Sequence, residues 1–136
     1  MNVPPKNKPS RIKYKNCKPV LIVDDTLGNR ELFAMQVREY GLPARHAETG
    51  KQAVDILAAE PDAFSLVMMD LSMPDMDGFR VAGELKTMPF PPLVILLSVH
   101  GDPASRERGY QVGCNAYVDK GQGWPALLEA MQKVLA

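Results

Sequence analysis

Short apolar runs alternate with longer amphipathic stretches from residue 19 to the end of the chain. The runs at 20–23 and 93–97 are apolar at every position, which is typical of strands buried in a parallel sheet. We predict strands at residues 20–23, 44–47 (the weakest), 65–69, 93–97 and 115–118. Apolar residues at helical spacing predict helices at residues 29–40, 50–60, 79–86, 104–112 and from about 125 onward. Strands that alternate with helices favour an α/β doubly wound sheet.

Two of the predicted helices have sequence features that bear on their packing or their stability. The helix at 29–40 has Leu32, Phe33, Val37 and Tyr40 at helical spacing, and we expect these side chains to face the core. The helix at 104–112 is a poor one, because an internal glycine costs about 1 kcal/mol relative to alanine. We therefore expect this helix to be weak.

Composition fits one domain that does not insert into a membrane. The chain has 136 residues, 46% of them hydrophobic, and no apolar run approaches the roughly 20 residues needed to cross a bilayer. Its two cysteines, Cys17 and Cys114, provide neither a disulfide framework nor the spacing of metal ligands. No secretory signal is visible, so we expect a cytoplasmic location.

The charge is divided unevenly along the chain. Residues 1–18 hold six basic residues and no acidic one, although the net charge of the whole chain is zero. We predict a disordered basic tail at residues 1–18 and a single domain at residues 19–136. The tail is only a weak hint of nucleic-acid binding, which would fall steeply with salt; a solvated extension is the simpler interpretation.

Polar residues with matching chemistry follow the predicted strands. Asp24 and Asp25 follow the first strand, Asp70 the third, Ser98 the fourth and Lys120 the fifth. Taken singly, each has a structural explanation such as a helix cap or an Asx turn. In a parallel sheet, however, these strand ends meet at one edge. Three carboxylates crowded there repel each other, and a hard cation such as Mg²⁺ (or Mn²⁺) would neutralise them. The set suits a phosphoryl group on or near Asp70.

Four sequence matches together identify a known family. They are VLIVDD (20–25), MMDLSMPDMDG (68–78), LLS (96–98) and AYVDK (116–120). In this order and spacing the chain resembles, over residues 19–136, the receiver domain of two-component response regulators. The resemblance implies a flavodoxin-like, CheY-like fold with strand order 2-1-3-4-5. It also implies that Asp70 accepts a phosphoryl group from a phosphohistidine, in a signalling domain that turns over no separate substrate.

The resemblance also assigns residues to the magnesium site. It implies that Asp25, Asp70 and the backbone carbonyl of Ser72 bind Mg²⁺ directly and that Asp24 acts mainly through coordinated water. Lys120 is expected to pair with the phosphoryl oxygens, or with Asp70 before phosphorylation. The phosphoryl donor is expected to be a sensor histidine kinase or a histidine phosphotransfer protein.

A switch follows from the same resemblance. Ser98 is expected to move toward the phosphoryl group and Tyr117 to change rotamer. These changes would remodel the face made by the fourth helix, fifth strand and fifth helix, through which a downstream protein binds. A homodimer is left open. We expect no output domain, because the chain stops with the last helix.

Two residues depart from the family pattern. Gly121 stands where the family commonly has proline, and we expect the loop that carries Lys120 to be more flexible as a result. Val99 stands where a smaller residue is frequent, and we hypothesise that it shields the acyl phosphate from water.

Three other interpretations are weighed against this one. A phosphatase of the haloacid dehalogenase superfamily uses a similar residue set, but there the nucleophile comes first in an Asp-x-Asp motif, whereas Ser72 stands two residues after Asp70. A flavodoxin-like FMN carrier would meet repulsion between its phosphate and Asp24-Asp25. A receiver-like module that has lost phosphorylation would lack a required residue, and none is missing.

Overall fold

The computed structural model describes residues 18–73, 77–99 and 101–136. The predicted basic tail, apart from Lys18, lies outside the described residues. Strands and α-helices alternate along the described part of the chain, and a short 3₁₀ helix (η2) precedes the last α-helix. In chain order they are β1 (Val20–Val23), α1 (Leu27–Tyr40), β2 (Ala44–Ala47), α2 (Gly50–Ala59), β3 (Leu66–Asp70), α3 (Gly78–Lys86), β4 (Val94–Ser98), α4 (Pro103–Gln111), β5 (Ala116–Asp119), η2 (Lys120–Gln122) and α5 (Gly123–Leu135).

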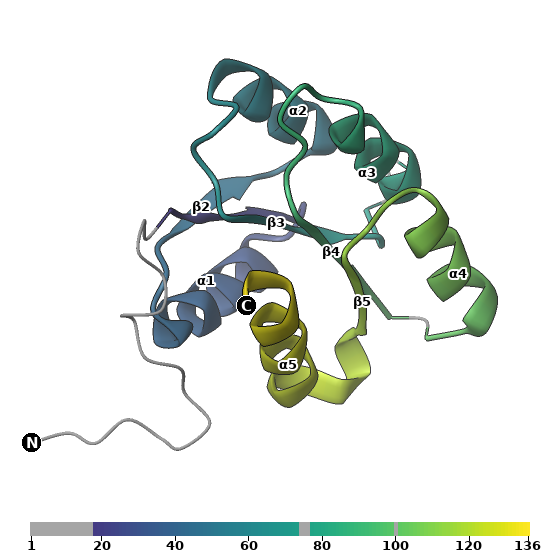
Figure 1. Ribbon diagram of the computed structural model, residues 1–136. Coiled ribbons are helices and arrows are strands. Elements are labelled where there is room, and N and C mark those ends of the chain that lie inside the picture. The colour runs from purple at the N-terminus through teal and green to yellow at the C-terminus, as the bar shows by residue number, and fades with distance from the viewer. Residues whose placement is uncertain (1–17, 74–76, 100) are drawn as a thin grey trace, which may run out of the picture.

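The strands form one parallel sheet in the order β2-β1-β3-β4-β5. Helices α1 and α5 cover one face of the sheet, and α2, α3 and α4 lie on the other (Figure 1). The predicted fold class and strand order are therefore confirmed. Among the described residues, no helix has the length and apolar character required to cross a bilayer.

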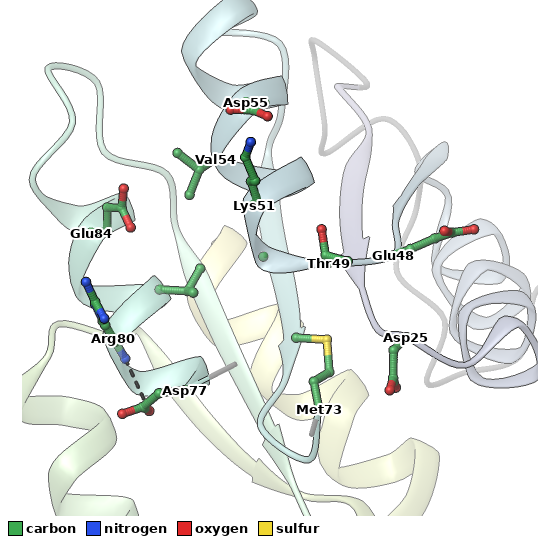
Figure 2. A pocket seen from close by; sticks show the side chains of 12 residues that line it. Asp25, Glu48, Thr49, Lys51, Val54, Asp55, Met73, Asp77, Arg80 and Glu84 are labelled. Carbon is green, nitrogen blue, oxygen red and sulfur yellow. Dashed lines mark hydrogen bonds between the residues drawn. The ribbon is translucent and has the colours of Figure 1, made fainter. Parts of the chain in front are cut away.

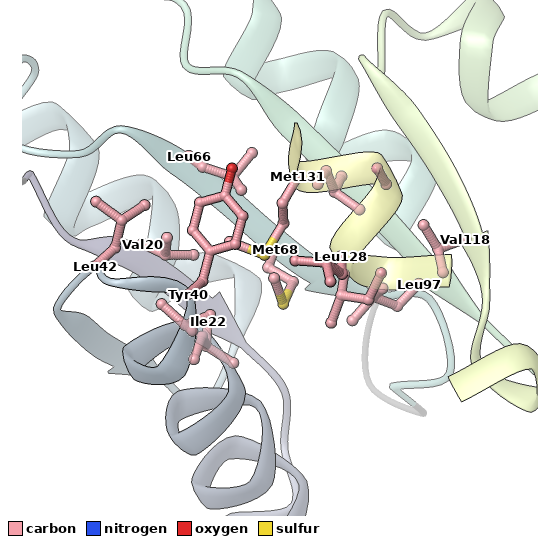
Figure 3. Close-up of a cluster of buried hydrophobic side chains, with 14 of the residues drawn as sticks. Val20, Ile22, Tyr40, Leu42, Leu66, Met68, Leu97, Val118, Leu128 and Met131 are labelled. Carbon is pink, nitrogen blue, oxygen red and sulfur yellow. The ribbon is translucent and has the colours of Figure 1, made fainter. Parts of the chain in front are cut away.

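Each face of the sheet has its own hydrophobic core. On one face Val20 and Ile22 pack with Tyr40 of α1 and Met131 of α5 (Figure 3). On the other face alternate strand residues, such as Val23, pack with α2 and α3. Because the central strands are buried on both faces, their sequences are apolar without a break.

Helix α1 differs from its prediction in both its start and its buried face. It begins at Leu27, two residues early, because the turn that precedes it is already closed by a hydrogen bond from the Thr26 amide to the Asp24 carboxylate. Leu32, expected in the core, is 46% exposed. The buried positions of the helix are Arg30, Ala34, Val37 and Tyr40.

Three strands run one residue further than predicted. Leu71 donates its amide to the Leu97 carbonyl at 2.8 Å, which continues the ladder between β3 and β4 past the apolar runs. As a result Asp70, Ser98 and Asp119 are the last residues of their strands. The ordered ladder therefore places two of the predicted site residues on strands rather than on loops.

Candidate metal and phosphoryl site

Three carboxylates meet at the carboxyl ends of β1 and β3. Asp24, Asp25 and Asp70 each offer an oxygen atom, and these oxygens all lie within 4.8 Å of one another. Asp24 and Asp70 are buried, with 1% and 3% exposure, whereas Asp25 is exposed. The sequence prediction that these three residues converge agrees with this placement.

Lys120 reaches into the same cluster. Its Nζ lies 2.9 Å from Oδ2 of Asp70 and 3.8 Å from Oδ2 of Asp24. The same Nζ lies over the ring of Phe33, 5.8 Å from the ring centroid. Because the lysine side chain is only 18% exposed, its charge is screened less by solvent than that of a surface pair.

A capped turn holds Lys120 where it is. Lys120 opens the η2 helix, and Oδ1 of Asp119 accepts a hydrogen bond from the Gly121 amide at 2.8 Å. A proline at this position would have no amide hydrogen to donate. The glycine that departs from the family pattern therefore contributes a hydrogen bond to the loop instead of only removing a constraint.

Burial of Asp24 beside Asp70 creates an electrostatic conflict in the cluster. Oδ1 of Asp24 accepts a hydrogen bond from the Thr26 amide at 2.8 Å, but within the described chain its buried Oδ2 has no hydrogen-bond partner. Burial raises the pKa of Asp24 above its ordinary value and the Asp70 carboxylate raises it further, whereas the Thr26 amide and Lys120 act against this shift.

These features fit a divalent cation. A buried carboxylate oxygen without a hydrogen-bond partner is costly unless a positive charge approaches it. All the donor atoms of the cluster are oxygens, which are the ligands that Mg²⁺ prefers. The Ser72 amide donates to Oδ1 of Asp70 at 2.9 Å, so the main chain of Ser72 lies beside the cluster.

The two predicted switch residues lie one and two strands away from Asp70. Ser98 is buried at the end of β4, the strand next to β3. Tyr117 of β5 is also buried, with 4% exposure, and its ring lies against α4 at Gly109. Arg106 of α4 places its guanidinium 5.2 Å from the tyrosine ring centroid and donates to the Tyr117 carbonyl at 3.1 Å.

A groove of about 720 Å³ between α2 and α3 opens beside the cluster. Figure 2 shows Asp25 and Met73 at one end of this groove and Asp55 toward the other. The exposed Asp25 is therefore open to solvent from the side of α2 and α3, while Asp24 and Asp70 are enclosed.

Sequence reasoning missed a buried arginine next to the cluster. Arg30 is 6% exposed and donates from Nη1 to the main-chain carbonyl of Asp24 at 2.8 Å. The sequence does contain an indication of this burial. Arg30 is spaced four and seven residues from Ala34 and Val37, so it lies on the same buried face of the helix. A charged residue on such a face needs a partner.

The chain matches the family model described as "Response regulator receiver domain" over residues 20–132. It is 32% identical over 120 residues to the gliding motility regulatory protein of Myxococcus xanthus, covering 85% of this chain and 15% of that protein. It is 32% identical over 105 residues to the probable transcriptional regulator ycf27 of Cyanophora paradoxa, covering 77% and 43%. The chain spans less than half the length of each of these relatives.

Solved structures of response regulators have a similar fold. The response regulator protein TrrA from Thermotoga maritima, in complex with Mg²⁺ and BeF, is similar with a TM-score of 0.75 and 29% identity, covering 86% of this chain and 98% of that one. The chemotaxis protein CheY4 of Vibrio cholerae is similar in fold with a TM-score of 0.76 and 24% identity, over 86% and 98%.

Proposed function

Because this chain belongs to the response regulator receiver family, we propose that it is a phosphoacceptor domain whose Asp70 takes a phosphoryl group from a phosphohistidine. The observation that carries the proposal is the contact of Lys120 with a buried Asp70 inside a cluster of three carboxylates. A structural salt bridge alone would not require two further acidic groups that repel the first.

The reacting group is the Asp70 carboxylate. One of its oxygens attacks phosphorus, a P–O bond forms, the P–N bond to the donor imidazole breaks, and the imidazole leaves with a proton from solvent. Asp24, Asp25, Asp70 and the Ser72 carbonyl would hold Mg²⁺, which offsets the charge of the phosphoryl oxygens. Lys120, now paired with Asp70, would then pair with a phosphoryl oxygen.

Ser98 and Tyr117 form the proposed route to the surface. The Ser98 hydroxyl, one strand from Asp70, would donate to the phosphoryl group. Tyr117 lies on β5 beneath α4, where Arg106 already holds its carbonyl. We propose that a change at Ser98 is passed to Tyr117 and alters the face of α4, β5 and α5, where a downstream protein or a second copy of the chain would bind.

The proposed phosphoryl donor is a sensor histidine kinase or a histidine phosphotransfer protein in the cytoplasm. Relatives include the probable histidine kinase 6 of Oryza sativa, which is 38% identical over 71 residues, or 7% of its length. The basic N-terminal residues remain the sole argument for nucleic acid as a partner, so we do not include nucleic acid in the proposal.

The test is the intact mass of the protein after incubation with acetyl phosphate and Mg²⁺. We expect a gain of one phosphoryl group that is lost in Asp70→Asn and retained in the control Asp55→Asn, which changes an exposed aspartate on α2. A gain that persists in Asp70→Asn, or no gain in the wild type, would overturn the proposal. Hydrolysis of p-nitrophenyl phosphate with steady turnover would favour a phosphatase instead.

A further inference from the structure

Arg30 is a buried cation between two loops that border the carboxylate cluster. Its side chain is 7% exposed; Nη1 lies 2.8 Å from the Asp24 carbonyl oxygen and Nη2 lies 3.5 Å from a carboxylate oxygen of Glu48. Burying a guanidinium is costly, and a pair with Glu48, which is 65% exposed, offsets little of that cost. The hydrogen bond to Asp24 is therefore the main contact of this charge.

That hydrogen bond completes a clamp on Asp24. Thr26 holds one carboxylate oxygen through its amide, and Arg30 holds the main-chain carbonyl. The oxygen left without a hydrogen bond is Oδ2, which lies 3.8 Å from the Lys120 ammonium. The clamp thus fixes the residue while one oxygen stays directed into the cluster.

The same contact also orients Asp25. The carbonyl held by Arg30 belongs to the peptide unit that joins Asp24 to Asp25, and a peptide unit is planar. A donor that fixes this plane limits the directions in which the exposed Asp25 side chain can leave the main chain. Glu48, the residue that follows β2, pairs with the other terminal nitrogen of the guanidinium, Nη2.

We propose that Arg30 is a positioning residue for the metal site, which it serves by fixing the Asp24–Asp25 peptide; this inference rests on the proposed function. The direction in which Mg²⁺ affinity changes when Arg30 is replaced distinguishes this positioning role from a purely electrostatic one. A nearby positive charge repels a divalent cation, so removing the charge alone would tighten metal binding. Removing a group that orients the ligands would weaken it, typically by 10- to 100-fold.

The experiment is a titration of the unphosphorylated protein with Mg²⁺ alone, followed by the backbone amide NMR signals around Asp25 and Ser72. The variants are Arg30→Met, which keeps most of the side-chain volume, and Arg30→Lys, which keeps the charge but not the two-pronged donor. Arg38→Met is the matched control, because Arg38 is an exposed arginine two turns further along α1.

We expect the Mg²⁺ dissociation constant to rise roughly 10-fold in Arg30→Met, to rise by a smaller factor in Arg30→Lys, and to stay unchanged in Arg38→Met. Amide spectra without metal must show the folded state. Should Arg30→Met not fold, Arg30→Lys decides the matter: weaker binding supports the inference and unchanged binding overturns it.

The experiments distinguish failure of the role proposed for Arg30 from failure of the proposed function. A wild type that binds Mg²⁺ and gains a phosphoryl group, beside an Arg30→Met variant that binds Mg²⁺ equally or more tightly, overturns the role of Arg30 and leaves the proposed function intact. A wild type that neither binds Mg²⁺ nor gains a phosphoryl group overturns the proposed function, and the role of Arg30 with it.

Discussion

Asp24 is expected to lower the stability of the metal-free protein. Its carboxyl group is buried beside Asp70 and its pKa is raised, so the folded state holds this proton more tightly than the unfolded chain does. The stability that the group contributes is present below the unfolded pKa and is lost as pH rises through the folded pKa. At neutral pH the ionised group is therefore a cost to the fold.

Replacing Asp24 by Asn should stabilise the metal-free protein at pH 7 by on the order of 1 kcal/mol, the scale of repulsion between close like charges. The gain should shrink as pH falls toward 3.8, the ordinary carboxyl pKa. Urea unfolding at several pH values measures it, with Asp55→Asn as an exposed control. A variant that is less stable than the wild type at pH 7 would contradict the conflict described for Asp24.

Val99 bears on the lifetime of the phosphorylated state. It follows Ser98 directly and its side chain is 55% exposed. If it shields the acyl phosphate from water, Val99→Ala should lose the phosphoryl group several-fold faster. The rate is measured by intact mass after removal of acetyl phosphate, with Leu32→Ala as a control on an exposed apolar residue away from the strand ends. Equal or slower loss in Val99→Ala removes the idea.

Among single residues, those that take part in the proposed chemistry could be predicted from the sequence more easily than those that hold them in position. Asp24, Asp70 and Lys120 stand at strand ends in a pattern that could be read directly. The spacing of Arg30 indicates its burial, but its role could not be assigned from the sequence, because its partner is a main-chain carbonyl, and main-chain atoms are the same at every position. The role of Gly121 was likewise obscured, since its amide donates to Asp119 and an amide leaves no trace in the sequence.

Helix α4 is attached to the molecule by few contacts. Gly109 is the one buried residue among the described positions of this helix. Two arginine side chains also attach it: Arg106 donates to the Tyr117 carbonyl, and Arg108 pairs with Asp77 at 3.1 Å and lies over the ring of Phe79. A helix held in this way is among the first to move when its neighbours change.

Gly109 and Gly83 provide a matched test of this packing. Each lies inside a nine-residue helix. A Cβ on Gly109 would come within 2.8 Å of the Tyr117 ring, whereas one on Gly83 would make an ordinary contact of 3.9 Å with Val112. We expect Gly83→Ala to stabilise the protein by roughly 0.5–1 kcal/mol and Gly109→Ala to destabilise it by about 1–3 kcal/mol. Urea unfolding compares them, and equal effects would contradict the close contact.

The elements were predicted well where the sheet is buried and less well at their ends. The central strands were found because burial on both faces leaves an unbroken apolar run. The strand ends were placed one residue short, because Asp70 and Ser98 are polar and their place in the ladder depends on a neighbouring strand. The low stability expected of the helix around Gly109 agrees with its sparse packing, although its close approach to Tyr117 required the structure.

At the scale of the whole molecule, Mg²⁺ bound at the carboxylate cluster should raise the stability of the folded state. A cation that binds only the folded state stabilises it by RT ln(1 + [Mg²⁺]/Kd), or about 1.4 kcal/mol at ten times Kd, which is a rise of about 5 °C in Tm for a domain of this size. Thermal unfolding with and without Mg²⁺ measures the shift, which a chelator should reverse. Asp25→Asn should abolish the shift without harming the metal-free fold, because Asp25 is exposed. The same shift in Asp25→Asn would place the ion elsewhere on the molecule.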